Sequence, residues 1–191
     1  MDPRQAAAEE ERHWRSLALP MPTRFAYIAY EDEFTVEESA RLLRCVLPQD
    51  MAEKWIVLVD DHRLSFHRSW TGCCIYAVTL VSPDEDDPTH YCTCDAIVNR
   101  EPSQWAATDD ALDVARLRWL VRTLLLHQEL ELPVDPAVPA EAALLDAWAF
   151  AGSVAFPGSV ALPTPAPADD VPAPELERRP PSNDPPLLRG R

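Results

Sequence analysis

Residues 64–72 read LSFHRSWTG, and this stretch decides how the middle of the 191-residue chain folds. Apolar Leu64 and Phe66 alternate with Ser65 and His67, which is the period of a strand with one face on a core. Arg68 follows on the core side, and Gly72 ends the stretch with a residue that is typical of turns. We therefore predict a strand over 64–68 and a tight turn at 71–72.

Four neighbouring segments predict further strands, because they are rich in apolar, aromatic and β-branched residues. They cover residues 24–30, 54–59, 73–81 and 90–98. The segment 54–59 is apolar on both faces, which is typical of a central strand. The turns at 60–63 and 71–72 are too short for parallel crossovers, so an antiparallel meander is expected. Residues 31–33 are predicted to be an acidic connector.

Two segments predict helices. Thr35 and Glu38 have the spacing of a capping box, and the helix that follows them should end before Pro48. A longer amphipathic helix should begin at Asp109 and run to about Glu129. The order strand, helix, several strands, helix indicates an α+β fold. We expect an antiparallel sheet of about four to five strands with two main helices on one face.

Composition divides the chain into four parts. Residues 1–16 are predicted to be a flexible or helical segment, 17–132 a single α+β domain, and 133–151 a linker that can contain a short helix. Residues 152–191 hold half of the 20 prolines, with clustered Ala and acidic residues. Such a composition buries too little apolar surface to offset the entropy of ordering, so a disordered Pro/Ala-rich tail is expected.

The formal net charge of −15 limits the partners of this protein. General nucleic-acid binding needs a basic face and is not expected. An acidic regulator or inhibitor that binds a basic partner protein is compatible with this charge. The sequence shows no apolar stretch long enough to span a bilayer and no signal peptide at its N-terminus, so a cytoplasmic protein without membrane contact is expected.

The turn is dense in side chains that bind or react. An arginine, an imidazole and hydroxyls near an exposed indole can hold a phosphate and stack a base or ribose. The candidate ligand-binding residues are therefore His67, Arg68, Ser69, Trp70 and Thr71.

A structural corner is the alternative to a binding site. In that alternative Trp70 packs in the core, Arg68 pairs with Asp60 or Asp61, and Thr71-Gly72 only makes the turn.

Catalysis is a further alternative, with His67 as general acid or base on a nucleotide or ADP-ribosyl substrate. A nucleophilic Ser69 is disfavoured because the chain has no strained Gly-x-Ser-x-Gly elbow at this position. We therefore expect binding rather than catalysis. No metal or cofactor is expected, since the pairs Cys73-Cys74 and Cys92-Thr93-Cys94 lack the spacing of zinc knuckles.

The hairpin also resembles a known sequence pattern. With Lys54-Trp55-Ile56 before it and Ile75-Tyr76 after it, it is similar to small bacterial proteins of unknown function that carry an aromatic-x-H-R-S-W-T-G hairpin. Similar segments accompany ADP-ribosylglycohydrolase-type genes, as separate chains or fused pieces. The resemblance implies an accessory role near ADP-ribose or nucleotide metabolism, and it carries over no catalytic residue. The ligand we expect is nucleotide-like, with Arg68 on a phosphate and Trp70 stacked on a ring.

Overall fold

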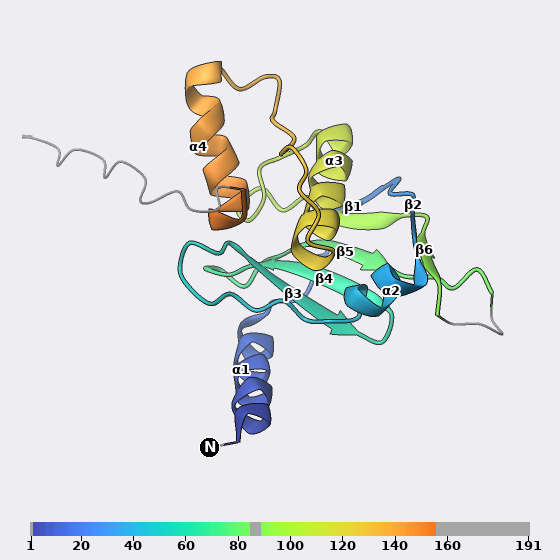
Figure 1. Ribbon diagram of the computed structural model, residues 1–191. Helices are drawn as coiled ribbons and strands as arrows, with labels where there is room; N and C mark the ends of the chain where they lie inside the picture. Colours follow the sequence, from blue (N-terminus) through green and yellow to red (C-terminus); the bar gives the residue numbers. More distant parts are fainter. Residues whose placement is uncertain (1, 85–88, 156–191) are drawn as a thin grey trace, which may run out of the picture. The chain divides into compact units, whose positions relative to one another are not determined.

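A five-stranded antiparallel sheet forms the centre of the computed structural model, which describes residues 2–84 and 89–155 (Figure 1). The strand order is β1-β7-β5-β4-β3, so the meander β3-β4-β5 is extended by β7 and then by β1. The predicted α+β class is confirmed. The strands of this sheet are β1 (Phe25–Ile28), β3 (Trp55–Asp60), β4 (Arg63–Arg68), β5 (Cys74–Thr79) and β7 (Ala96–Asn99).

Side chains cap the first turn of both predicted helices. Thr35 and Glu38 exchange the two hydrogen bonds of the predicted capping box, and Asp109 accepts from the N–H groups of Ala111 and Leu112. The α-helices in the described residues are α1 (Pro3–Leu17), α2 (Val36–Leu42), α3 (Asp110–Leu120) and α4 (Ala140–Ala151). A π-helix, η1 (Val121–Leu125), continues α3, and a 3-10 turn, η2 (Ser153–Ala155), follows α4.

The core lies on one face of the sheet, where two rows of side chains cross all five strands. These rows are Val57, Phe66, Tyr76, Val98 and Ala26, and Val59, Leu64, Val78, Ala96 and Ile28. Helices α2, α3 and α4 cover this face with buried Leu42, Leu117, Leu120 and Phe150, whereas α1 buries no residue. The predicted alternation of Leu64 and Phe66 with Ser65 and His67 therefore holds, and helices pack on one face as expected.

Two predicted helix ends are wrong, and the backbone conformation explains both. The helix after Thr35 ends at Leu42 rather than near Pro48, because Val46 forms a β-bridge with Val57 and needs extended backbone. The helix after Asp109 changes to π-helical hydrogen bonding at Val121 and does not reach Glu129. Residue His127 has a left-handed φ of 57°, which cannot continue a helix.

The predicted strand 90–98 is two strands. Its first part, β6 (Tyr91–Thr93), pairs with β2 (Asp32–Phe34) in a separate two-stranded sheet, and only its second part joins the main sheet as β7. Residues 31–33 were predicted to be a connector. Because the side chain of Phe34 is buried, this acidic segment instead forms part of β2.

The C-terminal part of the described chain extends past the predicted boundary at residue 152. Gly152 forms a β-bridge with Glu53, and the N–H of Ser153 donates to the carbonyl of Ala52. From residue 156 on, the predicted disordered tail lies outside the described residues. In the part of the chain that the structure describes, no helix has the length and apolar character needed to cross a membrane.

A buried carboxylate joins α3 to the sheet. Asp113 has no exposed surface, and it accepts hydrogen bonds from Tyr76 Oη at 2.7 Å, Trp105 Nε1 at 3.3 Å and Arg100 Nη1 at 2.6 Å. Burial and the adjacent Asp113 charge raise the pKa of Tyr76 well above its ordinary value, so the phenol stays a donor. Arg100 also pairs with Asp110 at 2.5 Å on the surface.

Replacing Asp113 by Ala should lower the free energy of unfolding by about 3–5 kcal/mol, because the buried donors of Arg100, Tyr76 and Trp105 lose their acceptor. Asp110→Ala is the matched control on the same arginine. Its side chain is 64% exposed, so the loss should be at most about 1 kcal/mol. Urea unfolding followed by tryptophan fluorescence measures both values. Equal losses for the two variants would show that the buried network does not stabilise the fold as argued.

Candidate functional site

The β4–β5 turn depends on Gly72. This glycine has φ of 72°, and its N–H donates to the carbonyl of Arg68 at 2.8 Å. A Cβ at this position would lie 2.1 Å from the carbonyl oxygen of Leu17. Glycine is therefore needed for the backbone conformation and for the close approach of the segment that follows α1.

His67 joins the turn to that segment. The imidazole is buried, and its Nδ1 lies 3.0 Å from the carbonyl oxygen of Gly72, which can only accept, so Nδ1 carries the proton. The backbone N–H of Leu19 donates to the same oxygen at 2.9 Å. Burial lowers the pKa of His67 below its ordinary value, while the Gly72 carbonyl and the Asp60 charge act in the opposite direction. The ring is therefore neutral near pH 7.

Arg68 lies on the other face of the sheet and caps α4. Its guanidinium donates to the carbonyl oxygens of Phe150 at 2.9 Å and Ala149 at 2.6 Å, and it lies 4.7 Å from the ring centroid of Trp55. Burial lowers the pKa of Arg68 to about 10. The predicted ion pair with Asp60 or Asp61 is wrong, because those residues are at the opposite end of β4.

Ser69 and Trp70 hold the loop before β3. Ser69 Oγ donates to the carbonyl of Glu53 at 2.8 Å, and Trp70 Nε1 donates to that of Met51 at 3.0 Å. Trp70 is 64% exposed, so the alternative in which it packs in the core is wrong. The residue follows the end of β4 and lies over this loop, where Lys54 Nζ is 4.0 Å from its ring centroid.

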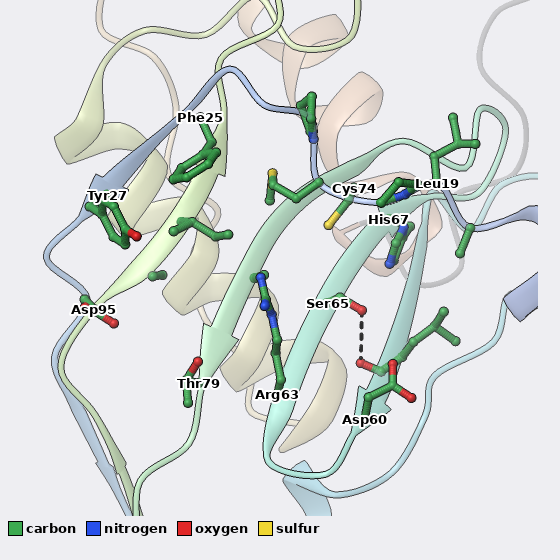
Figure 2. A pocket seen from close by; sticks show the side chains of 18 of the residues that line it. Leu19, Phe25, Tyr27, Asp60, Arg63, Ser65, His67, Cys74, Thr79 and Asp95 are labelled. Carbon is green, nitrogen blue, oxygen red and sulfur yellow. Dashed lines mark hydrogen bonds between the residues drawn. The ribbon is translucent and has the colours of Figure 1, made fainter.

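The candidate residues do not share one pocket. His67 lines a cavity of about 850 Å³ on the sheet face opposite the core, which we call the open-face cavity (Figure 2). Arg68, Trp70 and Thr71 line a second cavity of about 430 Å³ beside the C-terminal end of α4, which we call the hairpin pocket. The other residues of the hairpin pocket are Lys54, Gln104, Trp105, Asp146, Trp148, Ala149 and Phe150.

The hairpin pocket contains two cations that make no ion pair within residues 2–84 and 89–155, Lys54 and Arg68. Burial and the Arg68 charge lower the pKa of Lys54, whereas the Asp50 charge acts to raise it. The carboxylate of the pocket, Asp146, is bound by Arg116 at 2.5 Å. The pocket therefore presents positive charge in a protein whose formal net charge is −15.

Sequence reasoning selected only Arg68, Trp70 and Thr71 of this pocket, and among the residues that it missed are Lys54 and Trp148. Lys54 is the single lysine of the chain, and its Nζ lies 5.8 Å from the ring centroid of Trp148 as well as against Trp70. Trp148 belongs to α4, in the segment predicted to be a linker that can contain a short helix. Nothing local to the hairpin indicates that a helix so distant in sequence closes its pocket.

The neighbours of His67 offer no activated nucleophile. Ser69 Oγ is hydrogen-bonded to a backbone carbonyl, and no hydrogen bond joins it to His67 in the described part of the chain. Cys74 lies directly opposite His67 in the sheet, but burial raises the pKa of its thiol to about 12. A thiolate is therefore disfavoured there. Among the described residues, no group of three or more His, Cys, Asp or Glu side chains is placed to hold a metal ion.

The chain matches no family model, and comparisons with curated proteins and with solved structures find no similar protein. The resemblance of the hairpin to proteins associated with ADP-ribosylglycohydrolase-type genes therefore stays a prediction. Function has to be inferred from the side chains of the two cavities.

The buried, neutral His67 should make stability depend on pH. Its pKa is lower in the folded chain than its unfolded value of about 6.5, so the unfolded chain binds the proton more readily. The stabilisation is complete above about pH 6.5 and should be lost as the pH falls from there toward the folded pKa.

Urea unfolding of the chain and of His67→Gln between pH 5 and 8 tests this expectation. The variant should lose the part of the pH dependence that lies just below about pH 6.5. His62→Gln, at an exposed position, is the control and should keep it. An unchanged pH dependence in His67→Gln would refute the assignment.

Proposed function

We propose that this protein is a binding module that holds a phosphate-bearing ligand with a planar ring, of the nucleotide or ADP-ribose class, in the hairpin pocket. One observation carries the proposal: Lys54 and Arg68 line the same pocket without a carboxylate partner among the described residues, beside an indole that is 64% exposed. Cations with free donors attract phosphate, and an exposed indole offers a surface for stacking.

The donors of the pocket suit a phosphate group. A guanidinium has five N–H donors, and the two carbonyls at the end of α4 are the partners found for Arg68. Lys54 Nζ makes a long contact of 3.3 Å with the carbonyl of Met51, so its other protons are available. The Thr71 hydroxyl, which accepts from the N–H of Cys73 at 3.3 Å, has a proton to donate. These three groups come from two neighbouring segments of the sheet and can converge on one anion.

The size and the aromatic lining of the pocket suit a ring. A volume of about 430 Å³ lies within the range of small-molecule sites, roughly 300–1,000 Å³. Trp70 and Trp148 both line it, and stacking of a base on an aromatic side chain contributes about 1–3 kcal/mol. Trp70 Nε1 is fixed by the Met51 carbonyl, so its ring is already oriented when a ligand arrives. An anionic ligand is favoured over a cationic one because Lys54 already lies on the Trp70 ring.

The other predicted functions gain less support from the geometry. His67 lines the open-face cavity, away from Arg68 and Trp70, so an acid–base role for it next to a phosphate bound by Arg68 stays a prediction without a supporting contact. An acidic regulator that binds a basic partner protein also stays a prediction, supported by the net charge alone.

The single lysine gives a direct test of the proposal. ADP-ribose and AMP should bind the full chain and quench part of the tryptophan fluorescence, and they should slow acetylation of Lys54 by an N-hydroxysuccinimide ester. Lys54→Gln and Trp70→Ala should each weaken binding by about tenfold or more, which corresponds to about 1.4 kcal/mol. Calorimetric titration measures the affinities.

Two control variants accompany this test. Lys54→Arg keeps the charge and should keep most of the affinity, and Arg24→Gln removes an exposed charge that does not line the pocket and should change nothing. Absence of binding at millimolar ADP-ribose and AMP, or equal affinity of Lys54→Gln and the unmodified chain, would reject the proposed function.

A further inference from the structure

The open-face cavity is a second candidate site, separate from the hairpin pocket. Its floor is a row of side chains that crosses all five strands on the face opposite the core (Figure 2). This row is Leu58, Ser65, Ala77, Ile97 and Tyr27. The segment 18–22 after α1 and the aromatic residue Phe25 also line the cavity. A volume of about 850 Å³ places it among cavities that accept small organic molecules.

Arg63 is a cation of this cavity that has no carboxylate partner among the described residues. The sheet register places it opposite Asp60 on β3 and Thr79 on β5. Asp60, however, is bound by Arg15 of α1, whose Nη1 lies 2.8 Å from its carboxylate, and Arg15 also donates to the carbonyl of Val59. Among the described residues Arg63 therefore has no ion-pair or hydrogen-bond partner for its guanidinium, which extends into the cavity (Figure 2).

Two hydroxyl groups and an imidazole nitrogen lie near Arg63 on the floor of the open-face cavity. Ser65 is two residues further along β4, and its hydroxyl makes only a long hydrogen bond of 3.4 Å to the carbonyl of Leu58. His67 comes next on the same face, and because its Nδ1 carries the proton, its Nε2 is a hydrogen-bond acceptor. Thr79 adds a second hydroxyl beside Arg63. A guanidinium with neighbouring hydroxyls binds a planar carboxylate through two parallel hydrogen bonds.

The opposite end of the cavity has two aromatic rings, with the carboxylate of Asp95 beside Tyr27 (Figure 2). Phe25 is 41% and Tyr27 is 70% exposed, and their rings meet edge to face at 5.6 Å between centroids. Ala77 and Ile97 form the floor between these rings and Arg63. The small side chain of Ala77, at the centre of the row, leaves depth over the sheet for a ring. The arrangement places the Arg63 guanidinium at one end of the floor and the two aromatic rings at the other.

We propose that the open-face cavity binds an organic monocarboxylate with a bulky apolar ring, the carboxylate on Arg63 and the ring against Ile97 and Phe25. A monoanion is favoured over a phosphate dianion because Asp95 also lines the cavity and would repel a second negative charge. This site lies on the other face of the sheet from the hairpin pocket, so it does not depend on the proposed function.

The full chain, titrated with 2-naphthoate, tests this site by NMR. The methyl signals of Ala77 and Ile97 and the imidazole signals of His67 should shift, whereas the indole signals of Trp70 and Trp148 should not. The neutral analogue 2-naphthamide should bind at least tenfold more weakly, and 2-naphthyl phosphate should bind no more tightly than the carboxylate. Equal binding of the amide, tighter binding of the phosphate, shifts confined to Trp70 and Trp148, or no shifts at all would each overturn the proposal.

Variants distinguish a specific contribution of Arg63 to 2-naphthoate binding from a general effect of the protein's charge. Arg63→Gln should weaken 2-naphthoate binding at least tenfold, and Arg63→Lys should recover part of it. Arg24→Gln, an exposed arginine that does not line the cavity, should bind as the unmodified chain does. An unchanged urea unfolding curve for Arg63→Gln establishes that it is folded, and unchanged binding in that variant would overturn the assignment.

Discussion

The carbonyl oxygen of Gly72 accepts hydrogen bonds from His67 Nδ1 and from the N–H of Leu19, and the placement of the surrounding segments depends on this junction. It requires a glycine, because the backbone is left-handed and Leu17 lies against it. From the same turn Arg68 bonds the end of α4, and Ser69 and Trp70 bond the loop before β3. The motif HRSWTG thus joins three segments that are distant in sequence, each by buried or half-buried polar groups that would be costly to leave unpaired.

The hairpin therefore contains both polar groups that fix the backbone and polar groups that stay open to a cavity. Strand alternation sends His67 to one face of the sheet and Arg68 to the other, so neighbouring residues line different cavities. The groups that fix the backbone are His67 Nδ1, Ser69 Oγ and Trp70 Nε1. The exposed indole ring of Trp70, the Thr71 hydroxyl proton and the remaining donors of Arg68 are left for a ligand. A structural corner and a binding corner are therefore not exclusive alternatives.

The sequence predicts the fold well where the signal is local. The capping box at Thr35, the helix start at Asp109 and the period-two pattern of 64–68 each depend on neighbouring residues, and each is confirmed. The early end of α2 and the strand β2 depend on pairing with Val57 and with β6, which no local pattern reports. For the candidate site, too, the sequence predicts the residues that lie within one local motif and misses those that long-range packing brings to it. Arg68 and Trp70 could be selected from composition. Lys54 joins them through the pairing of β3 with β4, and Trp148 joins them only through the packing of α4.

The distribution of ion pairs separates the cations that have a carboxylate partner from those that do not, which composition alone cannot do. The chain has 32 acidic and 17 basic residues, so acidic partners outnumber the cations. Arg100, Arg116 and Arg122 have such partners in the described structure. Lys54, Arg68 and Arg63 instead line cavities without one, and for Arg63 the cause is visible: Arg15 has bound the carboxylate opposite it. A cation that lines a cavity and has no carboxylate partner in the described structure can bind an anionic ligand. In so acidic a protein, that position is a more specific sign of a binding site than the residue type itself.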